Sequence, residues 1–129
     1  MKILLTGSNG QLGHDFKKIF DRKNIEYIAT DSKELDITND EKLKKFFQGN
    51  RGITHIINCA AYNDVDKAEN DEKVWLLNAK APKKLAEISK EIGAIFVTYS
   101  TDFVFDGNKS FPYLEEDETK GLSEYGKSK

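Results

Sequence analysis

The chain has 129 residues, of which 38% are hydrophobic and 33% charged, and its net charge is −2. This balance is typical of one globular domain with its own core, and it lacks the basic stripe of a nucleic-acid-binding protein and the long apolar run of a membrane span. The single cysteine, Cys59, excludes an internal disulfide and is consistent with a cytoplasmic location.

The chain begins with a strand pattern followed by a helix pattern. Residues 2–6 form an apolar run that is typical of a strand buried on both faces of a parallel sheet. A glycine-rich turn follows, and apolar residues then recur at helical spacing as far as Phe20. Residues 25–30 are predicted as a second strand, which ends at Asp31.

A second helix and a third strand come next. Thr38 and Glu41 have the spacing of a capping box, which predicts a helix over residues 36–47. Residues 54–60 are again apolar and short, and they are predicted as the third strand.

The longest helix pattern covers residues 70–93, where one apolar stripe recurs. Pro82 lies inside this pattern and predicts a kink or break, and Gly93 is a suitable C-terminal stop. Residues 94–100 are predicted as a fourth strand. A long loop then leads to a last helix that begins near Leu122.

The alternation of strands and helices predicts parallel pairing with right-handed crossovers. We therefore expect an α/β fold, a Rossmann-like doubly wound parallel sheet of about four strands. Ligands of such sheets bind at the carboxyl ends of the strands, so this edge is where we expect the functional residues.

The first turn carries three glycines, Gly7, Gly10 and Gly13, between a strand and a helix. In that context Gly7 would allow the tight turn, Gly10 would let the backbone approach a pyrophosphate, and Gly13 would let the helix pack on the sheet. The spacing differs from the common G-x-G-x-x-G, and a glycine-rich turn without a ligand is the alternative.

Asp31, at the end of the second strand, can accept hydrogen bonds from an adenosine ribose and would repel a 2′-phosphate, which favours NADH over NADPH. Lys33 is close enough in sequence to meet such a phosphate, so both cofactors stay open. The alternative for Asp31 is a simple turn or cap residue.

Carbonyl reduction is suggested by a set of three residues near the end of the chain. Tyr125 and Lys129 are four residues apart, so they share one face of the last helix, and Thr101 follows the fourth strand. A lysine ammonium helps a neighbouring phenol to release its proton, which the tyrosine can pass to a carbonyl oxygen that receives a hydride. A threonine hydroxyl can hold the same oxygen.

Together these motifs resemble the extended short-chain dehydrogenase/reductase family, in particular its reductases of nucleotide-linked sugars. The resemblance covers the whole chain and is carried by the stretches MKILLTGSNGQLG, INCAAYNDVDKAE, LNAKAP, YSTDFVFDG and YGKSK.

The resemblance implies roles for individual residues. Besides the glycines, the implied cofactor contacts are Gln11 and Leu12 at the phosphates, Asp31 at the ribose, Asp36 and Ile37 at the adenine, and Ala61, Tyr62, Asn63 and Tyr99 along the rest of the site. Thr101 and Asp102 would face the sugar nucleotide. Tyr125 would be the proton donor, and Lys129 would also bind the nicotinamide ribose.

Two departures within this pattern bear on the reaction. Related dehydratases carry an acid where this chain has Phe103, which cannot act as a base, so plain ketoreduction is favoured over dehydration. Related reductases often carry proline before the tyrosine segment, where this chain has Gly121, and this leaves the sugar open. His14 and His55 lack metal-ligand spacing, so no metal site is predicted.

The implied activity is NADH- or NADPH-dependent reduction of the 4-keto group of a nucleotide-linked 6-deoxy sugar. The alternatives are another sugar-nucleotide ketoreductase or epimerase, and a non-catalytic dinucleotide-binding subunit like the regulatory subunit of methionine adenosyltransferase. We expect residues 1–129 to be the dinucleotide-binding domain, ending within the Tyr-x-x-x-Lys helix and lacking a C-terminal substrate domain. Such a fragment would be inactive alone, and a homodimer of the full-length protein is open.

Overall fold

The computed structural model describes all residues from 1 to 129 and shows a four-stranded sheet in the order β2-β1-β3-β4. The strands are β1 (Lys2–Thr6), β2 (Glu26–Thr30), β3 (His55–Asn58) and β4 (Ile95–Thr98). All three pairings are parallel. The predicted Rossmann-like α/β fold is confirmed.

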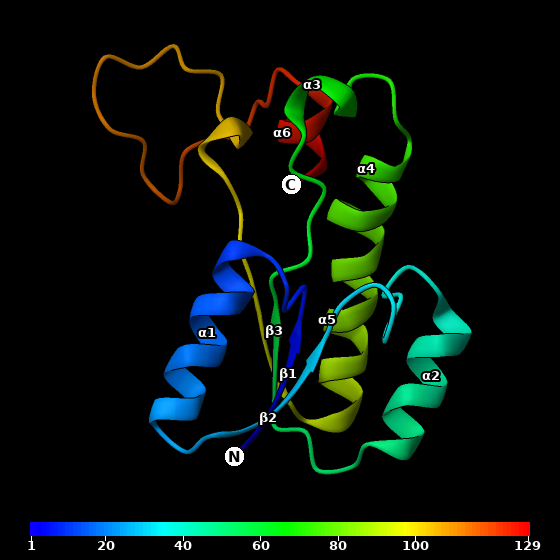
Figure 1. Ribbon diagram of the computed structural model, residues 1–129. Coiled ribbons are helices and arrows are strands. Elements are labelled where there is room, and N and C mark those ends of the chain that lie inside the picture. Colours follow the sequence, from blue (N-terminus) through cyan, green and yellow to red (C-terminus); the bar gives the residue numbers. More distant parts are fainter.

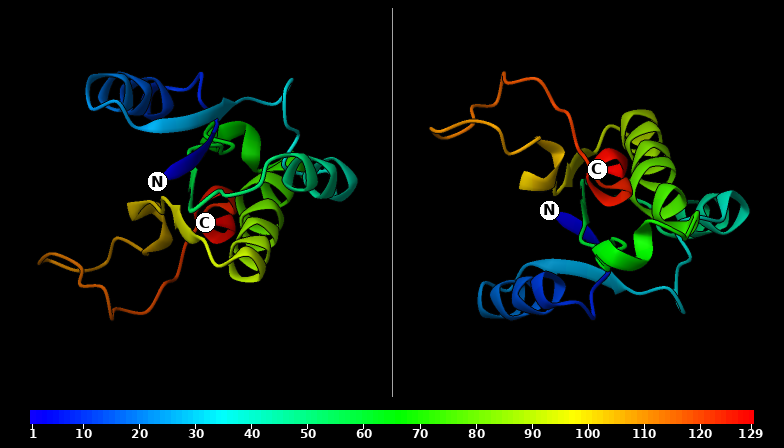
Figure 2. Two further views of the ribbon diagram at one scale, coloured as in Figure 1. Left: turned by 90° about the horizontal axis from the view of Figure 1, so that it is seen from below. Right: turned by 90° about the horizontal axis from the view of Figure 1, so that it is seen from above.

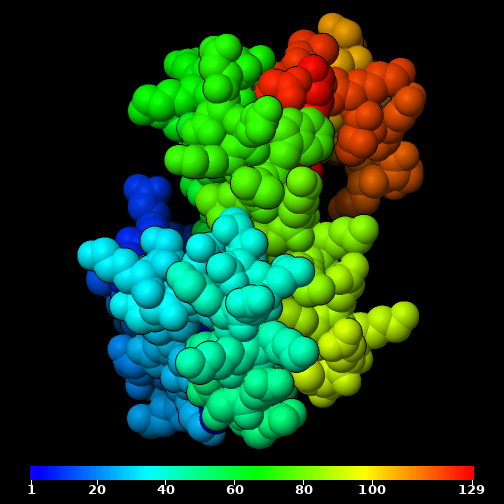
Figure 3. Space-filling model, turned by 90° about the vertical axis from the view of Figure 1, so that its right-hand side faces the viewer, coloured from blue at the N-terminus to red at the C-terminus, as the bar shows by residue number.

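Helices cover both faces of the sheet (Figures 1 and 2). Helix α1 (Gln11–Arg22) lies on one face, while α2 (Asp40–Gly49) and α5 (Ala81–Ile92) lie side by side on the other, as Figure 3 shows. The chain moves from β1 to β2 in one direction and then crosses back over β1 to β3. The strand order therefore reverses between β1 and β3, which is where open α/β sheets form their ligand crevice.

The alternation of side chains along β1 builds a core on each face of the sheet. Leu4 is fully buried on the side of α2 and α5, in a cluster with Leu43 and Leu85. Leu5 is fully buried on the opposite side, in a smaller cluster with Phe20 from α1. Burial of one such leucine contributes about 2 kcal/mol, so the two clusters together fix which way the strand faces.

The long helix after β3 is interrupted near Pro82, as the sequence predicts. It runs through α4 (Lys73–Trp75), a π-helical segment η1 (Leu76–Lys80) and then α5, in which Pro82 occupies the first turn. Proline cannot donate a backbone hydrogen bond, and placing it in the first turn removes the need for one. Gly93 ends α5 in the left-handed region, with φ 71°, and so the predicted stop is also confirmed.

The predicted capping box at Thr38 is wrong. Helix α2 begins one residue later, because the side chain of Asn39 accepts a hydrogen bond from the Lys42 amide at 3.0 Å. The hydroxyl and amide of Thr38 instead both donate to Asp36, at 2.6 and 3.0 Å. A short helix that the sequence did not reveal, α3 (Val65–Ala68), follows β3.

The chain after β4 forms a 3-10 turn, η2 (Asp102–Val104), then a loop, and finally α6 (Glu124–Ser128). The loop projects away from the sheet in Figure 1 and is held together by its own contacts, such as the stacked rings of Phe105 and Tyr113, 4.2 Å apart. Helix α6 starts slightly later than predicted, at the cap residue Ser123, and returns to lie beside α3 and α4. None of the helices has the length and apolar character needed to cross a bilayer.

Candidate functional site

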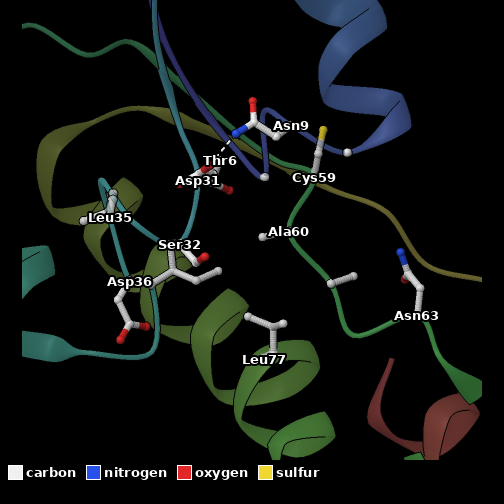
Figure 4. Close-up of a pocket in the computed structure, with 14 residues that line it drawn as sticks. Thr6, Asn9, Asp31, Ser32, Leu35, Asp36, Cys59, Ala60, Asn63 and Leu77 are labelled. Atoms are coloured by element: carbon white, nitrogen blue, oxygen red, sulfur yellow. Dashed lines mark hydrogen bonds between the residues drawn. The ribbon is translucent and has the colours of Figure 1, made fainter. Parts of the chain in front are cut away.

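Two adjoining cavities lie at the carboxyl ends of the strands, at the point where the strand order reverses. The first has a volume of about 280 Å³ and extends toward β2, and the second has a volume of about 330 Å³ and extends toward α6. They share a wall made of Gly10, Cys59, Ala60, Ala61 and Asn63. Figure 4 shows the first cavity, which the end of β3 borders on one side.

The glycine turn between β1 and α1 forms the base of both cavities. Gly7 has φ 66°, and a Cβ atom there would lie 2.4 Å from the backbone nitrogen of Ala60. A Cβ atom on Gly13 would lie 2.5 Å from the carbonyl oxygen of Gly7. Only glycine fits such contacts, so Gly7 allows the tight turn as predicted, and Gly13 lets the start of α1 pack closely on that turn.

Gly10 is where the turn becomes helix α1 and where the two cavities meet. It is the N-cap residue of α1, and no side chain caps the helix or adds an acidic group to its first turn. The first amides of a helix have no partner within it and carry a partial positive charge, so this end suits an anion such as a pyrophosphate. Gln11 and Leu12 line the second cavity next to it.

Acidic and apolar residues from the segment after β2 close the first cavity. Asp31 and Asp36 line it together with Leu35 and Ile37, as the roles implied for Asp31, Asp36 and Ile37 require. The hydrogen bond from the Thr38 hydroxyl is the main cause that holds the pKa of Asp36 below its usual value. Asp36 is therefore fixed against the start of α2 as a charged group.

The opposite end of the site brings Tyr125 and Lys129 together. Both side chains line the second cavity, which Tyr99 and Gly10 also line. The Tyr125 ring packs edge-on against Phe103, with the ring centroids 5.7 Å apart. Partial burial lowers the pKa of the Lys129 ammonium, because a charged group loses hydration there.

Other residues named from the sequence lie outside the two cavity walls. The Tyr62 hydroxyl points to Asp71, to which it donates at 3.0 Å, and the side chain lines neither cavity. The Thr101 hydroxyl donates to Asp102 at 3.1 Å and caps η2, while its neighbour Ser100 lines the second cavity instead. Gly13 is buried beneath the turn.

A buried polar ladder under the site went unnoticed in the sequence. The Thr6 hydroxyl donates to Asn58 at 2.6 Å, and the Asn58 amide donates to Thr98 at 3.2 Å, so β1, β3 and β4 are joined at their carboxyl ends. Thr6 and Asn58 are 1% and 3% exposed, which makes these side chains costly to leave unpaired. The signal was present, because each of the four strands ends on a polar residue.

A second missed residue, Asn78, connects the two halves of the site. Its side chain accepts from the Tyr62 amide at 2.7 Å, donates to the Tyr62 carbonyl at 3.0 Å and donates to the Ser128 hydroxyl at 3.1 Å. Ser128 in turn donates to the Tyr125 carbonyl at 2.7 Å. Asn78 occupies a position on the apolar stripe, four residues after Val74, and that buried polar position was the available signal.

Comparisons with known proteins agree on one family. The family model described as the RmlD substrate binding domain matches residues 1–129. The dTDP-4-dehydrorhamnose reductase of Burkholderia thailandensis is 40% identical and aligns with 100% of this chain and 43% of its own length. The corresponding Escherichia coli reductase is 35% identical, over 100% of this chain and 44% of its own. The chain thus spans a little under half the length of these relatives.

Solved structures give the same picture. A dTDP-4-dehydrorhamnose reductase from Clostridium acetobutylicum superposes with a TM-score of 0.95 at 46% identity, covering 99% of this chain and 46% of that one. A Bacillus anthracis reductase in complex with NADP has a TM-score of 0.92 at 34% identity, covering 98% and 45%. An L-threonine dehydrogenase from Clostridium difficile, at 20% identity and a TM-score of 0.87, shares the fold.

Proposed function

Because the chain belongs to the RmlD substrate binding domain family, we propose that it forms the cofactor-binding and proton-donating part of a sugar-nucleotide reductase. The reaction is NADH- or NADPH-dependent reduction of the 4-keto group of a nucleotide-linked 6-deoxy sugar, of the dTDP-4-dehydrorhamnose type. The relatives that match the whole chain carry that name, and one of them is a complex with NADP.

One observation carries the proposal. Tyr125 and Lys129 share a cavity wall with Gly10, and Gly10 in turn borders the cavity that contains Asp31. A dinucleotide laid across both cavities would have its adenosine near Asp31, its phosphates at the start of α1 and its nicotinamide near Tyr125. The residues fit this ligand, because glycines line the base of the turn and the helix end is uncapped.

The chain's own residues supply binding, orientation and a proton. When bound, the reduced nicotinamide supplies the hydride. The Tyr125 phenol gives its proton to the oxygen of the reduced carbonyl, and the neighbouring Lys129 ammonium stabilises the phenolate that remains. The Thr101 hydroxyl, three residues after the end of β4, now donates to Asp102 at 3.1 Å, and it would hold the same oxygen from the substrate side once it turns from that carboxylate.

The experiment has a binding step and a turnover step. The 129-residue chain is titrated with NADH and NADPH, and saturable binding is expected. Turnover is measured on a longer polypeptide in which this chain is followed by the remaining half of the Burkholderia thailandensis relative, as loss of NADH or NADPH absorbance with dTDP-4-dehydrorhamnose. Tyr125→Phe should abolish turnover and leave dinucleotide binding intact. Full turnover of that variant, or a wild-type chain that binds neither dinucleotide, would contradict the proposal.

A further inference from the structure

Asn9 contacts Asp31 across the mouth of the first cavity, and neither the sequence pattern nor the family resemblance gives Asn9 a role. The Asn9 side-chain amide donates to one carboxylate oxygen of Asp31, and the Lys33 backbone amide donates to the other at 2.7 Å. Figure 4 shows the Asn9 side chain reaching from the glycine turn toward Asp31. The carboxylate is therefore held from two sides.

These two hydrogen bonds leave the Asp31 carboxylate able to bind a ligand. A carboxylate has about four acceptor positions, so two stay free for the two hydroxyls of a ribose. Asp31 faces the cavity in the company of Ser32, and the Glu34 carboxylate accepts from the Asp31 backbone amide at 2.9 Å. Two acidic side chains thus occupy one short turn at the place where an adenosine 2′ position would lie.

A 2′-phosphate would need cations at this place, and no lysine or arginine lines the first cavity. The two arginines, Arg22 and Arg51, line neither cavity. The Lys17 ammonium donates to the side-chain oxygen of Asn9 at 3.4 Å, and Lys33 lines neither cavity although its backbone amide contacts Asp31. Asn9 therefore turns its donor to Asp31 and its acceptor to Lys17.

We propose that Asn9 is a positioning residue that makes this chain prefer NADH over NADPH, by fixing Asp31 toward the ribose 2′ position and by holding Lys17 back. The inference rests on the proposed dinucleotide site. A 2′-phosphate adds about 1.5 to 2 negative charges beside a fixed carboxylate, whereas a 2′-hydroxyl can donate to it. The Bacillus anthracis relative in complex with NADP shows that the fold itself admits the phosphate, so the side chains must make the difference.

The test compares dissociation constants of NADH and NADPH for the 129-residue chain, measured by nicotinamide fluorescence. AMP and adenosine 2′,5′-bisphosphate, used as displacing ligands, isolate the 2′ position. We expect NADH to bind at least about tenfold more tightly than NADPH. Asn9→Ala should reduce the ratio of the NADPH to the NADH dissociation constant severalfold, mainly because NADPH binds more tightly. Asp31→Asn should also reduce this ratio, both because NADPH binds more tightly and because NADH binds more weakly.

Matched controls separate selection from general damage. Asn63→Ala changes an asparagine in the same cavities that does not touch Asp31, so it should weaken both dinucleotides in the same proportion. Lys17→Ala should lower the affinity of Asn9→Ala for NADPH, and Lys18→Ala should not. A wild-type chain that binds both dinucleotides equally, or an unchanged ratio in Asn9→Ala, would overturn this inference and leave the proposed function standing. Binding of neither dinucleotide would overturn both.

Discussion

The Asn78 side-chain amide donates to the Ser128 hydroxyl at 3.1 Å, across fifty residues of sequence. This contact joins the π-helical segment to the last turn of α6. The Asn78 side chain also accepts a hydrogen bond from the Tyr62 backbone amide and donates one to the Tyr62 carbonyl. The helix that carries Tyr125 and the loop that follows β3 are therefore positioned by one buried side chain.

Asn78→Leu should lower the free energy of unfolding by about 3 kcal/mol, because it removes the hydrogen bonds of Asn78 to the half-buried Tyr62 backbone and to the buried Ser128 hydroxyl. Urea denaturation measures the change. Asn70→Ala is the control, since Asn70 is exposed and its side chain makes no hydrogen bond, and it should change the value by less than about 0.5 kcal/mol. A loss as small as that of the control would show that Asn78 does not hold the two segments together.

Alanine substitutions at three glycines distinguish the cost of backbone strain from the cost of a steric clash. Gly7→Ala meets both, since φ is 66° and the new Cβ would lie 2.4 Å from Ala60, whereas Gly93→Ala meets only strain, with φ 71° and open space. Gly49→Ala meets neither, because nothing lies within 4 Å. We expect a loss of about 1–2 kcal/mol for Gly93→Ala, a larger loss for Gly7→Ala and no loss for Gly49→Ala, as seen by thermal unfolding. An equal loss at Gly7 and Gly93 would contradict the contact with Ala60.

The acid stability of the chain should depend on Thr38. Its hydroxyl is the main cause that lowers the pKa of Asp36, so the folded state holds the Asp36 proton less tightly than the unfolded state does. The resulting stability is present above the usual aspartate pKa of about 4 and is lost as the pH falls through the lower folded value. Thr38→Val should therefore be less stable than the wild type at neutral pH. The gap, which is the difference in unfolding free energy between the two proteins, should narrow below about pH 4.

Denaturation curves across this pH range measure that gap, and an NMR titration of the Asp36 carboxyl measures its pKa directly. Thr119→Val is the control, because the exposed Thr119 hydroxyl contacts no carboxylate, and its difference from the wild type should not vary with pH. A Thr38→Val gap that is constant with pH, or an unchanged pKa of Asp36, would contradict the assignment.

The sequence predicted the elements whose signal is local. The apolar runs gave the strands, and the glycine turn and Pro82 acted as their backbone chemistry requires. The misplaced start of α2 shows the limit of local patterns, since Thr38 and Asn39 are both good cap residues. The Thr38 hydroxyl donates to Asp36, which leaves Asn39 as the cap, and the local sequence pattern does not predict that hydrogen bond.

The contacts that connect distant segments were out of reach for the same reason. Asn58 and Asn78 occupy positions in apolar patterns that mark them as buried polar residues, but only the sheet order and the return of α6 bring their partners to them. The contact between Asn9 and Asp31 likewise depends on the parallel register of β1 and β2, which places both loops at one edge. The sequence therefore predicted a candidate site from the glycines, Asp31 and the Tyr125 segment, and only the fold shows which residues contact and position them.

Gly126, the residue after Tyr125, sets how closely α6 approaches the turn that carries Thr101. A Cβ atom there would lie 2.1 Å from the Phe103 carbonyl oxygen, so no side chain fits without moving the helix. Gly121 lies against the same place, since its Cβ would lie 2.7 Å from the Gly126 carbonyl carbon. The two glycines allow backbone-to-backbone packing, and α6 is therefore positioned by contact as well as by Asn78.

If Tyr125 is the proton donor as proposed, Gly126→Ala should move it away from the substrate carbonyl, and a shift of about 1 Å can cost about 100-fold in rate. In the longer polypeptide we expect kcat to fall by at least about tenfold, while the KM for the dinucleotide changes less, because the proposed phosphate and adenosine contacts at the glycine turn and Asp31 come from elements other than α6. Lys127→Ala, on the exposed side of the same helix, is the control and should keep kcat within about twofold. An unchanged kcat in Gly126→Ala would show that the contact with Phe103 does not position the tyrosine. A matching rise in KM would place the damage in dinucleotide binding instead.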